Sequence, residues 1–309
     1  MQTNENNFLR LRFGLSALVI AAGAIVSAST CLAFLARVHW GCDLFTHFRV
    51  QYFISLLVAV LLLVKWHRRW TKVFAIFAIV NLSYIAPFYF SKSERDEMAA
   101  RRPVRALLIN LNSTYGNIAR TMDVIREADP DLIVLEEVSG RWSEPIETIK
   151  DAYPMTVTLP REDNFGIAVL SNLEMSETEV LFLGPAEVPT VTATVKAGDK
   201  EFTLIATHPL PPAGAMHSKA RNEQLRGLAH LSATAELPVL LLGDLNVTPW
   251  SPHFQDLLRT GHLNDSMRGH GIQPSWPTWM PIFFVPMGAV TPLDEIMRLW
   301  RRVRCNLAF

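Results

Sequence analysis

An acid and an amide stand two positions apart directly after a short apolar run. The run Val239–Leu242 has the length and composition of a buried strand, and Gly243-Asp244-Leu245-Asn246 follows it at once. The end of a strand is a rigid place from which a fold can hold polar groups for chemistry. Asp and Asn also form ordinary Asx turns. Taken alone, the segment leaves a reactive site and a plain turn equally open.

Polar residues follow other strand-like runs of the chain in the same way. The runs at residues 104–109, 131–135, 202–207 and 290–293 are followed by Asn110, by Glu136 and Glu137, by His208 and by Asp294. Carboxylate and amide oxygens suit Mg²⁺ or Mn²⁺, and a histidine can donate to a phosphate oxygen or exchange a proton. A solvated acidic pair or a surface or core histidine is the plain alternative for each. Five such strand ends in one domain favour a site for a hard metal ion and phosphate.

The elements that carry these residues alternate along the chain. A strand at 104–109, a helix at Ile118–Ala128 and a strand at 131–135 are followed by strand-like runs at 165–171, 191–195 and 202–207 and by a helix at 219–235. This succession predicts α/β layers around a largely antiparallel core. About 200 residues follow position 104, enough for one sizeable core.

The first ninety residues differ from the rest in hydropathy. Apolar runs at residues 13–35, 51–64 and 73–90 predict three transmembrane helices in a membrane domain of residues 1–90. A cleaved signal peptide is the alternative for the first run, and core helices of a globular protein for all three. Two further apolar runs and the lack of a small-residue cleavage site disfavour the signal peptide. The charged segment 91–103 is interpreted as a linker.

The charges are also unevenly distributed. Residues 1–90 hold eight Lys and Arg and two Asp and Glu, whereas residues 91–309 hold 21 and 27. The basic segment 65–72 is expected in the cytoplasm together with Arg10 and Arg12, and the chain after Phe90 outside it. Arg37 and Arg49 lie in the opposite loop and weaken this bias. The prediction is a multi-pass protein of the cell (inner) membrane with a periplasmic or extracellular C-terminal domain.

Several motifs between residue 104 and about residue 297 resemble the endonuclease/exonuclease/phosphatase superfamily, whose fold is that of pancreatic-type DNase. They are Leu108-Ile109-Asn110, the run 131–138 ending Leu135-Glu136-Glu137-Val138, Gly166-Ile167-Ala168-Val169-Leu170-Ser171, Ala206-Thr207-His208, Gly243-Asp244-Leu245-Asn246 and Leu293-Asp294-Glu295-Ile296. The family commonly has Leu-Gln-Glu-Val where this chain has Leu135-Glu136-Glu137-Val138. Glu137 therefore matches its metal-binding glutamate. Three spans before such a domain resemble a bacterial membrane-anchored branch.

The resemblance implies a four-layer α/β sandwich with two packed, mainly antiparallel sheets, preceded by the three transmembrane helices. It also implies metal-dependent cleavage of a phosphate ester. Glu137 and Asn110 would hold Mg²⁺ or Mn²⁺, and Asp244 would orient or activate the attacking water. His208 and Asn246 would bind the phosphate, and Asp294 would match an aspartate of the penultimate strand.

One departure from the family concerns its terminal Ser-Asp-His, which this sequence lacks; no Asp-His pair occurs anywhere in it. Loss of an acid–base group commonly costs about two to four decades of rate. The expectation is a C-terminally truncated domain over residues 104–309 with weak or no activity. A catalytically impaired, membrane-anchored binding or scaffold protein is the alternative. The expected partners are the membrane and a phosphate ester of nucleic acid, a lipid head group or another envelope phosphate, and no protein partner is inferred. The acidic balance disfavours duplex DNA.

Overall fold

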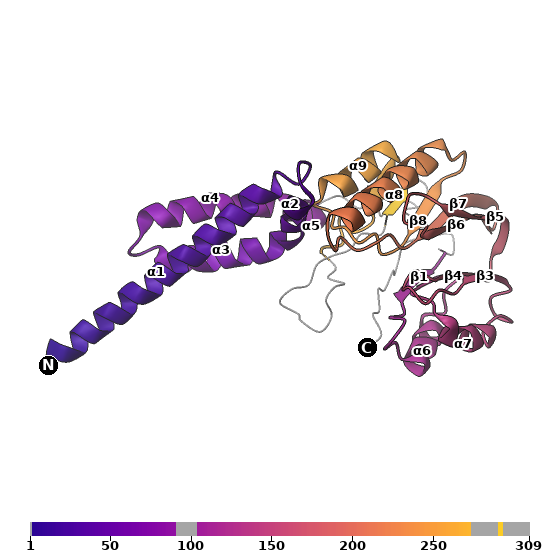
Figure 1. The fold of residues 1–309 in the computed structure, drawn as a ribbon, viewed down its shortest axis with the longest axis horizontal. Helices are drawn as coiled ribbons and strands as arrows, with labels where there is room; N and C mark the ends of the chain where they lie inside the picture. The colour runs from indigo at the N-terminus through magenta and orange to yellow at the C-terminus, as the bar shows by residue number, and fades with distance from the viewer. Residues whose placement is uncertain (1, 91–103, 273–289, 293–309) are drawn as a thin grey trace.

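The computed structural model describes residues 2–90, 104–272 and 290–292, and joins a group of long helices to an α/β domain (Figure 1). In the α/β domain the strands are β1 (Ala106–Asn110), β2 (Leu132–Glu136), β3 (Met155–Leu159), β4 (Ile167–Ser171), β5 (Glu174–Phe182), β6 (Pro189–Ala197), β7 (Lys200–Thr207), β8 (Val239–Leu242), β9 (Leu263–Asp265) and β10 (Val290–Pro292). Its helices are α6 (Ile118–Ala128), η2 (Gly140–Trp142), α7 (Ser143–Glu147), α8 (Ala215–Thr234) and α9 (Pro252–Thr260).

The strands form two mixed sheets, in the orders β1-β2-β4-β3 and β5-β6-β7-β8-β10-β9. Two pairs are parallel, β1 with β2 and β7 with β8, and the other described pairs are antiparallel. The parallel register places Asn110 beside Glu136 and Ala206 beside Leu242. Each parallel pair therefore ends at one edge of its sheet, where the polar residues follow.

Alternate residues of the strands face two different cores, and this produces the predicted four layers. Leu108 and Val134 of one sheet pack with Val191, Leu204 and Leu242 of the other between the sheets. On the outer face of the first sheet, β1, β2 and β4 pack against α6, η2 and α7. On the outer face of the second sheet, β7 and β8 pack against α8 and α9. The α/β sandwich is thus confirmed, with mixed but mostly antiparallel sheets.

The strands β3, β5 and β9 were not expected from the sequence, and β5 is the most polar of the longer ones. β5 lies at the edge of the six-stranded sheet, and most of its residues are at least partly exposed. Its many polar residues leave little hydrophobic alternation, although Met175 packs against the core between the sheets. The predicted linker 91–103, Asp294 and most of the C-terminal segment lie outside the described residues.

The helical part consists of α1 (Gln2–Ala33), α2 (Trp40–Leu44), η1 (Phe45–Phe48), α3 (Arg49–Leu63), α4 (Arg68–Ile85) and α5 (Pro87–Phe90). Two of its stretches, Gly14–Ala33 and Trp40–Leu63, are long and apolar enough to cross a membrane. The third predicted span, at residues 73–90, is not among these candidates. It forms most of α4, whose first turns carry Arg68, Arg69 and Lys72 and leave only a short apolar stretch after them.

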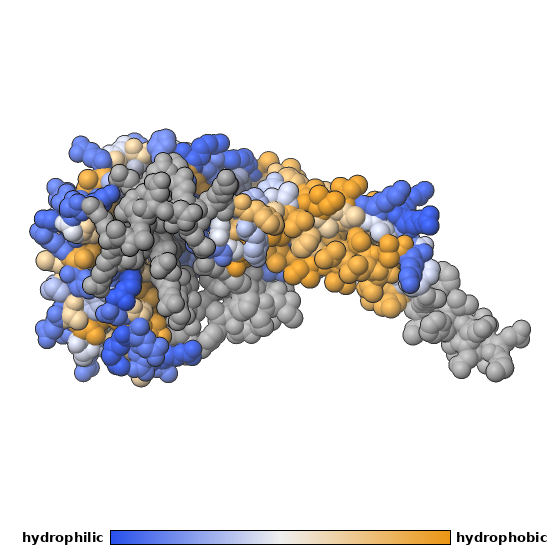
Figure 2. Space-filling model, turned by 180° about the vertical axis from the view of Figure 1, so that it is seen from behind, coloured by the Kyte–Doolittle hydropathy of each residue, from blue (hydrophilic) through white to orange (hydrophobic). Residues whose placement is uncertain are grey.

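The outer surface of the helical part is apolar as well as its interior. Leu56, Leu63, Phe74 and Ala78 are buried between α3 and α4. Side chains on the outside are more than half exposed, among them Leu18, Ile25, Leu61, Ile76 and Ile79. Figure 2 shows hydrophobic residues over most of the visible face of these helices, with hydrophilic residues near the end far from the α/β domain. Helices that are apolar all round are typical of segments in a membrane or in a large core.

Arg37 and Arg49, the two arginines of the loop opposite the basic segment 65–72, make contacts within the protein. They lie at the end of the helical bundle near the α/β domain. Arg37 pairs with Asp256 of α9. Arg49 is buried, its guanidinium lies 4.4 Å from the Tyr84 ring centre, and it donates to Asn81 Oδ1 at 3.2 Å. These charges therefore serve contacts within the protein, and they carry little information about the orientation of the chain.

Gly23 is the close-approach position of the bundle. A Cβ atom there would lie 2.5 Å from the ring of Phe74, which is fully buried, whereas a Cβ at Gly14 would meet nothing within 4 Å. We expect Gly23→Ala to lower the Tm of the full-length protein in detergent, because overpacking of this kind costs about 1–3 kcal/mol. Gly14→Ala is the matched control and should leave the Tm unchanged or raise it. Equal Tm values for the two variants would contradict the packing of α1 against α4.

Candidate active site

Asn110 and Glu137 meet where β1 and β2 end. Asn110 Nδ2 donates to Glu137 Oε1 at 2.8 Å, and the Ser113 N–H donates to Glu137 Oε2 at 3.2 Å. Glu137 has a φ of +57°, a left-handed conformation that turns the chain away from the direction of β2. The parallel pairing of the two strands makes this meeting unavoidable, because Asn110 is in register with the residue before Glu137.

Glu136 joins the two sheets at this edge. Its side chain is fully buried, and its Oε1 accepts the backbone N–H of Asp244 at 2.7 Å. Burial, together with the negative charges of Asp244 and Glu137, raises the pKa of Glu136 well above its ordinary value. The raised pKa favours the neutral acid, which has the shape of the glutamine that is common in the family. The sequence shows Glu136 as a polar residue at the end of β2, but the resemblance to the family assigns a function only to its neighbour Glu137.

Gly243 permits the approach of the strand ends. A Cβ atom at this position would lie 1.8 Å from the carbonyl oxygen of Thr207, so no other residue fits without moving the backbone of β7. The next residues form the expected turn, in which Asp244 Oδ1 accepts the N–H of Asn246 at 3.0 Å. Burial raises the pKa of Asp244 to about 6, although the hydrogen bond from Asn246 acts in the opposite direction. The plain Asx turn is thus present, and the candidate residue Asp244 lies within it.

His208 is oriented by Asn246. Asn246 Nδ2 lies 2.8 Å from the Pro209 carbonyl oxygen and 3.3 Å from His208 Nε2. An atom that faces a carbonyl oxygen at this distance must be the amide nitrogen, so its second hydrogen points to Nε2 and the imidazole proton sits on Nδ1. Burial lowers the pKa of His208 to about 4, and the charge of Glu137 acts against this shift. His208 is neutral, and its buried Nδ1 has no partner among the described residues.

The structure brings together most of the residues singled out in the sequence. Asn110 and Glu137 come from one sheet, and His208, Asp244 and Asn246 from the other. The bond from Asp244 to Glu136 and the effect of the Glu137 charge on His208 place them at one edge of the sandwich. Asp294 lies outside the described residues. Asn246 differs from expectation, because its amide group is engaged by His208 and Pro209 and orients the histidine.

The donor set at this edge fits a hard divalent cation. Among the described residues, no group of three His, Cys, Asp or Glu side chains is placed to hold a metal ion. Mg²⁺, however, commonly takes only one or two carboxylates and keeps several waters. The carboxylate of Glu137 and the amide oxygen of Asn110 are ligands of this type.

The comparisons with known proteins agree with this geometry. The family model described as "Endonuclease/Exonuclease/phosphatase family" matches residues 107–289, more than half of the chain. The chain belongs to this family. Its members are hydrolases that act on phosphate esters, and they generally use divalent metal ions. No curated protein matches the sequence.

Solved structures share the fold at low sequence identity. A β-hairpin deletion mutant of beta toxin from Staphylococcus aureus is 16% identical, with a TM-score of 0.50 over 68% of this chain and 92% of that one. TDP2 from D. rerio complexed with a single-strand DNA product is 13% identical, with a TM-score of 0.51 over 62% and 86%. An AP endonuclease from Archaeoglobus fulgidus is 16% identical, with a TM-score of 0.50 over 60% and 85%. These likenesses show the fold alone.

Glu136 gives a test of the connection between the sheets. Glu136→Gln keeps the acceptor for the Asp244 N–H and copies the neutral acid, so we expect the Tm at neutral pH to stay unchanged or rise. Glu136→Leu leaves that N–H unpaired at a cost of about 1–3 kcal/mol, and the Tm should fall by several degrees. Thermal unfolding of both variants decides the point. A Gln variant as unstable as the Leu variant would mean that Glu136 is ionised.

Proposed function

We propose that the protein is a metal-dependent hydrolase of phosphate esters, of phosphodiesterase or nuclease type, anchored in the membrane and facing outside the cytoplasm. One observation carries the catalytic part of this proposal. The Glu136–Asp244 hydrogen bond brings the strand ends with Asn110 and Glu137 to those with Asp244 and His208. Oxygen ligands, a carboxylate and a neutral histidine then share one edge of the fold.

Each of these residues has a chemical task. Glu137 and Asn110 would hold the divalent cation, which when bound would polarise the phosphate and stabilise the charge that develops on its oxygens. Asp244 orients the attacking water and takes its proton. His208 donates its Nδ1–H to a phosphate oxygen, where a positioned donor stabilises charge in the transition state. Asn246 keeps His208 in the required tautomer.

The membrane part of the proposal rests on the arrangement of the helices. α4 packs along α3, since Phe74 and Ala78 lie against Leu56 and Leu63. If α3 crosses a membrane, α4 lies beside it in the same layer, so we propose a third span although α4 is short. The basic residues 65–72 connect these two helices at the end of the bundle away from the α/β domain (Figure 1). A cytoplasmic basic loop then leaves the domain on the outer side.

The substrate class follows from location and charge. Residues 91–309 are acidic overall, whereas proteins that bind duplex nucleic acid commonly carry a basic stripe. The site stands on the domain that adjoins the bundle. We propose lipid head groups or other envelope phosphates ahead of nucleic acid, with no protein partner needed for the reaction.

Activity can be measured on the full-length protein in detergent with Mg²⁺ or Mn²⁺. The substrates are bis-p-nitrophenyl phosphate, sphingomyelin and plasmid DNA. We expect Asp244→Ala to lower kcat by about 10²–10⁴-fold, and Glu137→Ala to abolish turnover together with metal binding measured by calorimetry.

The matched control is Glu201→Ala, an exposed acid at the opposite end of β7, which should behave as wild type. Wild-type protein that neither binds metal nor turns over any of these substrates would contradict the proposal. It would favour the binding or scaffold role instead.

Topology has a separate test. A reporter that is active only outside the cytoplasm should be active when fused after Phe90 and silent when fused after Trp66, because the positive-inside rule places the 65–72 loop in the cytoplasm. The reverse pattern would refute the orientation. Equal signals from both fusions would refute a crossing by α4.

A further inference from the structure

The helical part touches the loop that carries the catalytic motif. Residues 246–251 follow Gly243-Asp244-Leu245 and are all buried. Thr248 Oγ1 lies 2.9 Å from His47 Nδ1 of η1, and Trp250 Nε1 donates to the Tyr84 carbonyl of α4 at 3.0 Å. Trp250 also makes an edge contact with the ring of Phe88, whose centre lies 6.2 Å away. The loop at residues 246–251 therefore packs against η1, α4 and α5 of the helical part.

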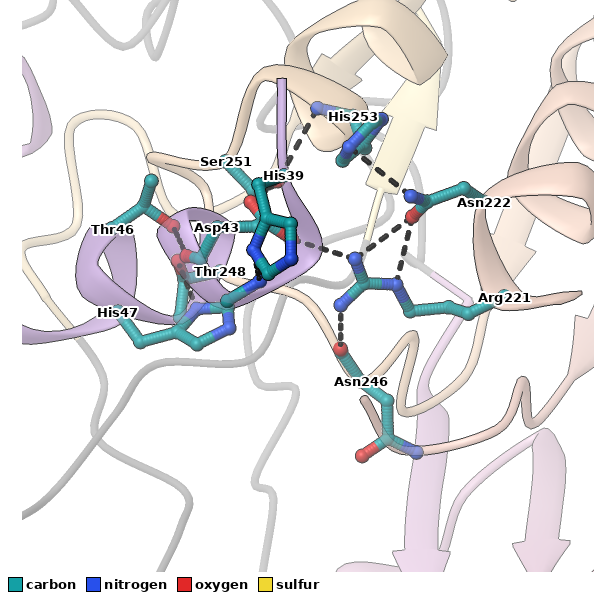
Figure 3. Close-up of polar contacts among 11 residues, drawn as sticks. His39, Asp43, Thr46, His47, Arg221, Asn222, Asn246, Thr248, Ser251 and His253 are labelled. Carbon is teal, nitrogen blue, oxygen red and sulfur yellow. Dashed lines mark hydrogen bonds and ion pairs between the residues drawn. The ribbon is translucent and has the colours of Figure 1, made fainter. Parts of the chain in front are cut away.

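A buried ion pair lies at the centre of this contact (Figure 3). Asp43 of α2 and Arg221 of α8 are separated by 178 positions, yet Arg221 Nη2 lies 2.6 Å from Asp43 Oδ2. The Arg221 side chain is 0% exposed and that of Asp43 is 2% exposed. The second oxygen of Asp43 accepts the hydroxyl of Ser251, the N-terminal cap of α9, at 2.7 Å.

The same arginine reaches the catalytic loop. Arg221 Nη1 donates to the backbone carbonyl oxygen of Asn246 at 2.9 Å. Its Nε and Nη2 both donate to Asn222 Oδ1, so the planar guanidinium is held on three sides. Asn246 has a φ of +50°, a conformation that a non-glycine residue keeps only when its surroundings hold it. The side chain of Asn246 in turn orients His208.

We propose that Asp43 of the membrane region is a positioning residue of the phosphate-ester site, acting through Arg221 on Asn246 and His208. The inference rests on the proposed function and adds to it a residue outside the α/β domain. Asp43 fixes the guanidinium, the guanidinium fixes the Asn246 carbonyl, and the Asn246 amide fixes the histidine that faces the phosphate. The α/β domain without its membrane helices lacks the first member of this series of contacts, and the buried Arg221 then loses the carboxylate with which it pairs.

The test uses the full-length protein in detergent and the variant Asp43→Asn, which keeps the shape of the side chain and removes its charge. We expect kcat on bis-p-nitrophenyl phosphate to fall by up to about 10²-fold, because a small misplacement of a catalytic group can cost that much. The substrate KM and the metal affinity by calorimetry should change little, since Asn110 and Glu137 lie in the other sheet. Arg37→Gln is the matched control, because it breaks the exposed Arg37–Asp256 contact of the same interface without touching the loop.

Arg221→Lys separates positioning from ion pairing. Lysine keeps the positive charge that pairs with Asp43, but it cannot also donate the hydrogen bonds that the guanidinium makes to Asn246 and Asn222. We expect this variant to keep a Tm closer to that of wild type than Asp43→Asn does, with a comparable loss of kcat. Arg221→Lys also tests the proposal if Asp43→Asn does not fold.

Hydrogen exchange of the peptide 243–251 provides a readout without turnover. Exchange should be faster in Asp43→Asn and in Arg221→Lys than in wild type or Arg37→Gln. A lower Tm with unchanged kcat and unchanged exchange would overturn the proposal and leave Asp43 a structural residue. If wild type shows no turnover but exchange responds as expected, the positioning stands and the proposed function fails.

Discussion

The hydrogen bond from the Asp244 N–H to Glu136 Oε1 is the contact on which the site depends. It joins residues 108 positions apart and connects the end of β2 in one sheet to the end of β8 in the other. Without this bond the sandwich would still bury its core, but the two halves of the site would lose the hydrogen bond that links them in the described part of the chain. The carboxyl group accepts this hydrogen bond in either protonation state, and its burial raises its pKa. Gly243 lets the chain after β8 lie close to the end of β7, because a Cβ atom there would lie 1.8 Å from the Thr207 carbonyl oxygen.

The local parts of this arrangement could be predicted from the sequence. The helix at Ile118–Ala128 and the strand at Val239–Leu242 were placed with the observed bounds, because buried apolar residues at a regular spacing are a local signal. Asn110, Glu137, His208, Asp244 and Asn246 stand out for the same reason, since each lies at or soon after the end of such an element, and their functional roles stay predictions. Asp294 remains a prediction.

The connections between distant segments could not be predicted. Nothing near Asp43 or Arg221 in the sequence indicates that they form a pair, and both resemble ordinary charges beside apolar runs. The engaged amide of Asn246 depends on the Pro209 carbonyl, a backbone atom without a sequence signature. The third span is not among the candidate membrane helices, because the first turns of α4 carry Arg68, Arg69 and Lys72, and a hydropathy run does not show where such a helix begins.

The junction between the helices and the α/β domain combines two kinds of contact with different consequences. Ile85, Phe88, Trp250 and Met267 form an apolar cluster whose burial is favourable but tolerant of small shifts. The Asp43–Arg221 pair does not tolerate such shifts, because separating two buried charges leaves each unpaired at a cost of about 3–5 kcal/mol. Replacement of the pair by apolar residues would often be neutral for stability, so stability alone does not account for it. The pair selects a single docking of α2 against α8, and that docking is the one in which Arg221 reaches the Asn246 carbonyl.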